Sequence, residues 1–141
     1  MTPDPHDPAS IARFIDGIGR GVVATVSPTG SPEAALVGLA ALPDGTLIFN
    51  TADAARKVEN LRERGRVAVV ICVDGDVSVQ LEGDAAIVEG TERLRYGHAY
   101  DRRFPGSRAL ADGFLVVVVR PDWVRVYDAG QRPAVVREAG W

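Results

Sequence analysis

The sequence contains few of the side chains that carry out chemistry without a cofactor. It has one cysteine, Cys72, and two histidines in 141 residues. A single cysteine excludes an intrachain disulfide, and these three side chains lie far apart, without the spacing of a zinc site. A glycine-rich phosphate loop and the Gly-x-Ser-x-Gly motif of serine hydrolases are also absent. If the protein is an enzyme, we therefore expect a bound cofactor to carry the reaction.

Cys72 lies in the apolar run VAVVICV, so we expect it to be a buried, small apolar residue. A buried apolar strand is a poor environment for a thiolate. This position argues against a nucleophilic pair of Cys72 with His98.

Long hydrophobic segments are absent as well. No apolar run reaches the roughly 18 residues of a membrane span, and the longest, Phe14 to Val26, is interrupted by Asp16, Arg20 and glycines. The N-terminal MTPDPHDP lacks the basic and then apolar pattern of a secretory signal. A net charge of −3 argues against a general nucleic-acid-binding surface. We expect a cytoplasmic protein that binds neither membranes nor nucleic acids.

The overall composition is that of one globular domain, with 46% hydrophobic and 25% charged residues. Residues 1–8 contain three prolines and little apolar content, which predicts a flexible N-terminal tail. Residues 9–128 are predicted to form the folded domain. Residues 129–141 are predicted to form a C-terminal arm.

The hydrophobic pattern predicts a mainly β fold. Ile11, Phe14, Ile15 and Ile18 lie at i, i+3, i+4 and i+7, which indicates a helix that Gly19 can end. Further helices are predicted over 53–64, burying Ala54, Val58 and Leu61, and over 90–104. Strands are predicted over 20–27, 33–42, 46–50, 66–73, 77–88, 113–120 and 123–127, with turns such as Asp74–Asp76 and a break at Pro121-Asp122. Gly83, inside the strand over 77–88, is predicted to mark a bulge or a close approach. Six or seven antiparallel strands in a chain of this length close most economically into a small barrel.

One local feature breaks a rule of helix stability. The helix after the strand LIFNT is expected to start near Asp53, with Thr51 or Asp53 as N-cap, so Arg56 and Lys57 lie in its first turn. Cations there oppose the helix dipole by about 0.3–1 kcal/mol each, whereas a bound phosphate would reverse that sign. Two interpretations remain open at this point: a phosphate site, or solvated cations that lean on Asp53 and Glu59.

Much of the chain resembles a known family. The run VVATVSPTGSPEAALVGLAALPDGTLIFNTADAARKVENLRERGRVAVVI, followed by VSVQLEG, resembles the pyridoxamine 5′-phosphate oxidase-like flavoproteins, the FMN-binding split barrels. The resemblance covers roughly residues 22–90, and RPDWVRVYD resembles the closing strand of one bacterial branch. It implies a six-stranded split barrel and a homodimer with one flavin in each of two clefts between the subunits.

The resemblance also implies a cofactor site. In the family a threonine at a strand end and an Arg-Lys pair at the next helix hold the flavin phosphate, and these match Thr51, Arg56 and Lys57. The strand before the third one, here residues 34–38, usually lays its backbone along the flavin ring. A glutamine that the oxidase places near the ring matches Ser78, with Gln80 two residues later. The implied cofactor-binding residues are Ala35, Leu36, Val37, Asn50, Thr51, Arg56, Lys57, Ser78, Gln80 and Trp123.

The chain departs from the oxidase itself at several positions. Ala35 and Ala40 stand where the oxidase has Arg and Lys. The basic C-terminal signature that grips the substrate is missing, although Trp123 and Arg125 can fill part of that space. The resemblance therefore implies a small FMN-dependent oxidoreductase that exchanges hydride with an unknown small substrate.

Two other functions are compatible with the same fold. The first is a reductase that uses a deazaflavin coenzyme, whose long acidic tail would need further cations such as Arg20 or Arg125. The second is a non-catalytic flavin- or haem-binding protein, for which His98 is the haem ligand to consider.

Overall fold

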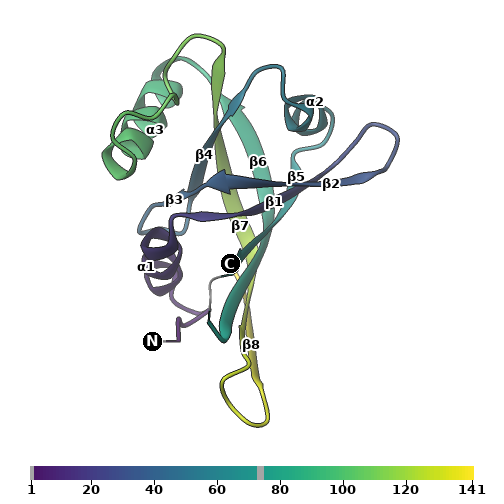
Figure 1. Ribbon diagram of the computed structural model, residues 1–141, viewed down its shortest axis with the longest axis vertical. Helices are drawn as coiled ribbons and strands as arrows, with labels where there is room; N and C mark the ends of the chain where they lie inside the picture. Colours follow the sequence, from purple (N-terminus) through teal and green to yellow (C-terminus); the bar gives the residue numbers. More distant parts are fainter. Residues whose placement is uncertain (1, 73–74) are drawn as a thin grey trace.

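The computed structural model describes residues 2–72 and 75–141 (Figure 1). Val73, Asp74 and the side chain of Cys72, on which three of the expectations above depend, lie outside the described part. Within it the chain forms three helices and eight strands. The helices are α1 (Pro8–Ile18), α2 (Arg56–Glu63) and α3 (Gly90–Arg103). The strands are β1 (Arg20–Val26), β2 (Pro32–Gly38), β3 (Ala40–Ala41), β4 (Leu47–Ala52), β5 (Arg66–Cys72), β6 (Val77–Val88), β7 (Phe114–Asp128) and β8 (Val135–Gly140).

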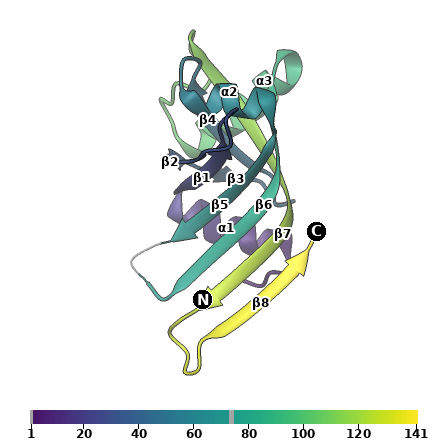
Figure 2. The ribbon, with the colours of Figure 1, turned by 90° about the vertical axis from the view of Figure 1, so that its right-hand side faces the viewer.

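All the strands belong to one antiparallel sheet, with the order β2-β1-β5-β6-β7-β4-β3 and with β8 paired to β7. The two outermost strands of this path, β2 and β3, are separated in the chain by Leu39 alone. The sheet therefore has to curl until its edges approach each other, as Figure 2 shows. Leu39 N–H donates to the Gly19 carbonyl at 3.0 Å, which interrupts the strand predicted over 33–42. This mainly β, curled sheet confirms the predicted split-barrel fold class.

The core lies inside the curl of the sheet and under α1. Ile11 and Ile15 of α1 are fully buried against Phe49 and other apolar residues of the sheet, which confirms the predicted apolar face. The Asp7 carboxylate caps the helix by accepting the Ala9 N–H at 3.0 Å. A second apolar cluster packs Tyr96 and Tyr100 of α3 against β4 and β7.

Helix α2 begins later than the sequence suggested. Its first residue is Arg56, not Asp53, because β4 stays paired with β7 through Ala52 and a turn follows. Neither Thr51 nor Asp53 therefore caps the helix; the N-cap is Ala55, whose side chain makes no cap hydrogen bond. Ala54, predicted to be buried, is exposed in that turn.

Strand β7 runs without a break through Pro121, so the predicted interruption there is wrong. Pro121 lies opposite Gly83, where the register between β6 and β7 shifts. A bulge tolerates proline because one ladder hydrogen bond is already lost there. A Cβ at Gly83 would lie 2.3 Å from the Arg120 carbonyl oxygen, so the predicted close approach at this glycine is confirmed.

The two ends of the chain contact each other. The predicted C-terminal arm contains β8, and Trp141 follows it. The Trp141 ring covers Gly45, and its Nε1–H donates to the Pro5 carbonyl at 2.8 Å. Asp4 N–H donates to Ser10 Oγ at 2.9 Å. In the described residues no helix combines the length and apolar character that crossing a membrane requires.

Candidate functional site

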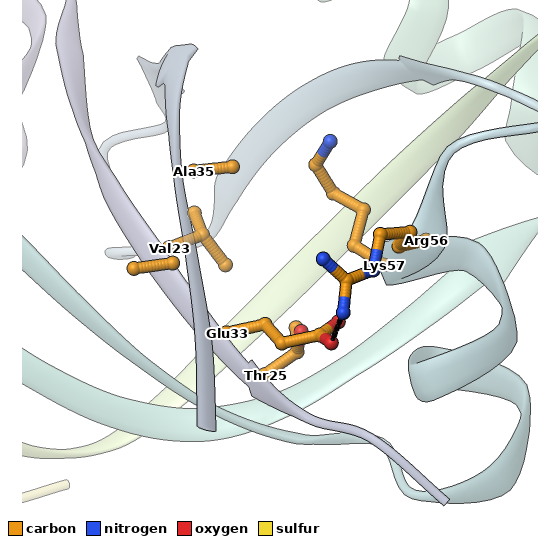
Figure 3. Close-up of a pocket in the computed structure, with 7 residues that line it drawn as sticks. Val23, Thr25, Glu33, Ala35, Arg56 and Lys57 are labelled. Carbon is orange, nitrogen blue, oxygen red and sulfur yellow. Dashed lines mark hydrogen bonds and ion pairs between the residues drawn. The ribbon is translucent and has the colours of Figure 1, made fainter. Parts of the chain in front are cut away.

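A cavity of about 240 Å³ lies between β1, β2 and the start of α2 (Figure 3). Its floor is formed by small and apolar residues of the two strands, and its charged groups come from β2 and from the start of α2. The lining residues are Val23, Thr25, Glu33, Ala34, Ala35, Arg56 and Lys57. Pockets for whole drug-sized ligands usually span about 300–1,000 Å³. This volume suits one end of such a ligand, for example its phosphate.

Arg56 and Lys57 are the first two residues of α2. This position is closer to the helix N-terminus than the sequence suggested, so both cations oppose the helix dipole more directly. In Figure 3 the Arg56 guanidinium turns toward Glu33, whereas the Lys57 ammonium points away from that carboxylate. The cavity therefore offers two cations and a helix N-terminus to an anionic group.

Glu33 is the third charged residue of the cavity. One of its oxygens, Oε2, forms an ion pair with Arg56 Nη2, and the other, Oε1, accepts a 2.8 Å hydrogen bond from Asn60 Nδ2. The Asn60 amide also donates to Thr25 Oγ1 at 2.9 Å. Asn60 is 2% exposed, so a buried amide holds the carboxylate in place.

Glu33, Asn60 and Thr25 were not among the site residues predicted from the sequence. A signal was present, because Asn60 lies four residues after Arg56 and therefore projects from the same side of α2. Glu33 and Ala35 are two residues apart in β2, so their side chains likewise lie on the same face of the strand. Arg56 could accordingly have been paired with a carboxylate from the strand, instead of with Asp53 or Glu59.

Only part of the candidate set gathers at this cavity. Ala35, Arg56 and Lys57 line it. Thr51 is buried in β4, where its hydroxyl donates to the Ala52 carbonyl at 3.3 Å. The neighbouring Asn50 is half-buried.

The remaining candidates on β2 diverge from one another. Leu36 is 66% exposed on the opposite face of the strand, and Val37 packs against the core.

A second group lies on the outer face of the sheet. We use this term for the surface formed by alternate residues of β2, β1, β5, β6, β7 and β8 on the side away from the core. Gln80 and Trp123 line a cavity there with Val22 and Ala24. Val22 and Val23 are successive residues of β1, so this cavity and the Arg56 cavity lie on opposite faces of the sheet. Ser78 pairs with Tyr127 on the same outer face.

The residues considered for other cofactors lie elsewhere. Arg20 is exposed at the first position of β1. Arg125 lies on the outer face, with Nε 3.7 Å from the Glu138 carboxylate. His98 is exposed on α3, a helix that packs on β4 and β7.

Comparison with known proteins gives one family and a set of similar structures. The sequence matches the family model described as pyridoxamine 5′-phosphate oxidase over residues 8–128. A conserved hypothetical protein of Mycobacterium tuberculosis is similar, with 28% identity, a TM-score of 0.72, and coverage of 85% of this chain and 83% of that one. No curated protein matches the sequence.

Two further structures share the fold at lower identity. A haem-binding protein of Mycobacterium smegmatis has 24% identity and a TM-score of 0.78; the match covers 99% of this chain but 59% of that protein. A pyridoxamine 5′-phosphate oxidase-related, FMN-binding protein of Nostoc punctiforme has 14% identity and a TM-score of 0.64, with coverage of 96% and 91%.

Proposed function

The chain belongs to the pyridoxamine 5′-phosphate oxidase family, and from this premise we propose that it is an FMN-binding oxidoreductase whose Arg56 and Lys57 hold the flavin phosphate. The observation that carries the proposal is the placement of these two cations at the start of α2, above a cavity of small residues. Helix N-termini and cations are the groups that bind phosphate in proteins. A bound phosphate would offset the unfavourable interaction of both cations with the helix dipole, whereas Glu33 forms its ion pair with Arg56.

Bound FMN would supply hydride exchange with a small substrate at its ring. The protein would bind and orient the cofactor. In this proposal the Ala35–Val37 backbone lies along the ring, and Thr51 and Asn50 at the end of β4 support the phosphate end. The small side chain of Ala35 leaves room for a ligand where a larger residue would fill the cavity.

The substrate proposed here is not pyridoxamine 5′-phosphate. Ala35 and Ala40 supply no cation for a second phosphate, and Ala40 is buried, 3% exposed. The substrate class that fits is a small molecule without a phosphate that β2 or β3 would have to bind.

We propose further that the protein acts as a homodimer. Gln80 and Trp123 lie on the sheet face opposite the Arg56 cavity, so one copy cannot bring both groups to one flavin. A second copy packed on the outer face can place its own Arg56 cavity beside Gln80 and Trp123. Three of the four large hydrophobic side chains that are exposed in the described part lie on this face, namely Leu36, Tyr127 and Val136. Burial of such side chains is the usual driving force for association.

Two alternative functions have a specific observation or residue behind them. A haem-binding role is favoured by the likeness to the haem-binding protein of Mycobacterium smegmatis; a Soret band that is lost on His98→Ala would support it. A deazaflavin coenzyme would use Arg20 or Arg125 for its acidic tail, and comparing the affinities for FMN and a deazaflavin separates these two cofactors.

The direct experiment is the visible absorption spectrum of the purified protein, recorded after FMN is added and the excess is removed. We expect flavin bands at about one FMN per chain, because each chain carries one Arg56–Lys57 cavity. A protein that retains no flavin would contradict the proposal.

A further inference from the structure

The cavity proposed to hold the FMN phosphate already contains an anion that belongs to the protein. The Glu33 carboxylate forms an ion pair with Arg56, the first residue of α2 (Figure 3). With Arg56, Lys57 and Glu33 as its charged lining residues, the cavity has a formal charge of +1 instead of the +2 that the two cations alone would give. Any phosphate that enters meets one cation that is already paired and a fixed negative charge beside it.

The two partners of this ion pair differ in freedom. The Arg56 side chain is 84% exposed, whereas the Glu33 side chain is 17% exposed. Glu33 is also fixed at its second oxygen by the buried Asn60 amide. The carboxylate therefore stays in the cavity while the arginine can change partner.

We propose that Glu33 is an internal counter-anion that competes with the ligand phosphate for Arg56 and so sets the affinity of this site for phosphorylated ligands. The inference rests on the proposed FMN site and deepens it. Lys57, whose ammonium points away from Glu33 in Figure 3, makes the first contact with the phosphate. Arg56 then exchanges the carboxylate for the phosphate, and the repulsion between Glu33 and the bound phosphate lowers the affinity. A flavin without a phosphate does not experience this competition.

The opposite role is physically possible and predicts the opposite result. A carboxylate that merely orients Arg56 toward the ligand would raise the affinity for phosphate, because a held arginine loses less side-chain entropy on binding. Replacing Glu33 would then weaken FMN binding.

The test is a titration of wild type and Glu33→Gln with FMN and with riboflavin, followed by flavin fluorescence. The glutamine oxygen can still accept the Asn60 hydrogen bond, so the substitution removes the charge and retains the packing. We expect Glu33→Gln to bind FMN about three- to tenfold more tightly, the scale of losing one competing ion pair and one like charge. Riboflavin affinity should stay within about twofold of wild type, since it carries no phosphate.

Two further variants make the result specific. Glu63→Gln removes the same charge at the far end of α2 and should leave FMN affinity unchanged. In an Arg56→Ala background, Glu33→Gln should give a smaller gain than in wild type, because the competition for Arg56 is gone and only the repulsion between Glu33 and the phosphate is relieved. If Glu33→Gln does not fold, Glu33→Ala is measured in its place with the same expectation.

Each outcome decides the inference. Wild type that binds FMN, with Glu33→Gln that binds it equally or more weakly, overturns the role of Glu33 and leaves the proposed function standing. A gain of similar size for riboflavin also overturns that role. Failure of both wild type and variant to bind FMN overturns the proposed function and this inference together.

Discussion

Asn60 and Glu33, 27 residues apart in the chain, are joined by a 2.8 Å hydrogen bond from Nδ2 to Oε1. The same amide donates to Thr25 Oγ1, so a single buried side chain ties α2 to both β1 and β2. Because α2 begins with Arg56 and Lys57, this contact also holds the backbone that carries both cations beside the cavity. The stability of the fold and the geometry of the candidate site therefore share one residue.

Asn60→Ala should destabilise the protein by about 1–3 kcal/mol, because it leaves Thr25 and Glu33 without a buried hydrogen-bond donor. Urea denaturation measures this change in the free energy of unfolding. Asn50→Ala is the matched control, since Asn50 is half-buried and its side chain makes no hydrogen bond in the described part of the chain. Equal costs for the two substitutions would show that the Asn60 contacts contribute little.

Gly83→Ala should destabilise the sheet by about 1–3 kcal/mol, the usual cost of overpacking. Its Cβ would lie 2.3 Å from the Arg120 carbonyl oxygen, and backbone on the paired strand cannot move aside easily. Gly17→Ala is the contrasting case. Gly17 lies in α1 with nothing within 4 Å of the added Cβ, so alanine should stabilise the helix by about 0.5–1 kcal/mol. Thermal denaturation of both variants measures these opposite shifts. A Gly83→Ala variant that melts at or above the wild-type temperature would contradict the packing at the bulge.

Leu36→Asp should convert the proposed dimer into a monomer, since it puts a charge on the outer face of β2. Sedimentation velocity measures the change in mass. Leu94→Asp is the control: Leu94 is 50% exposed on α3, against 66% for Leu36 on β2, and does not lie on the outer face. A wild-type protein that is already monomeric would rule out the dimer, and equal effects of the two substitutions would place the interface elsewhere.

Asp122 should contribute a pH-dependent part of the stability. A hydrogen bond from Arg66 lowers the pKa of the Asp122 carboxyl below its usual value of 3.8. A lowered pKa in the folded state means that the unfolded chain binds the proton more readily, so this contribution is present above about pH 4 and is lost as the pH falls through the folded-state pKa. The difference in thermal midpoint between wild type and Asp122→Asn should shrink from about pH 6 to about pH 3. A difference that stays constant would mean that the ion pair does not act through this titration.

Most of the fold could be predicted from the sequence, because helix and strand patterns depend on residues close together in the chain. The apolar face of α1 and the close approach at Gly83 follow from spacing and residue type, and the structure confirms both. The break expected at Pro121 was wrong because a bulge in the neighbouring strand, which sequence periodicity does not reveal, accommodates the proline. The start of α2 was placed three residues too early because pairing between β4 and β7 extends strand β4 to Ala52.

The candidate site was harder to predict because its contacts are not local. Arg56 and Lys57 were identified from the helix-dipole rule, which needs the sequence alone. The residue that pairs with Arg56 is Glu33 on another element, 23 positions earlier, and no local rule selects it over Asp53 or Glu59. The separation of Gln80 and Trp123 from this cavity likewise depends on the register of β1, β5 and β6.

The central claim is that Arg56 and Lys57 hold the phosphate of FMN. The most direct measurement is an FMN titration of wild type and of the double variant Arg56→Ala/Lys57→Ala. The double variant Arg13→Ala/Arg62→Ala is the control, because it removes the same charge at exposed positions. We expect the Arg56/Lys57 variant to bind FMN about 10- to 100-fold more weakly, the scale of losing charged hydrogen bonds to phosphate, and the control to bind as wild type does. Equal FMN affinity in wild type and the Arg56/Lys57 variant would contradict the account.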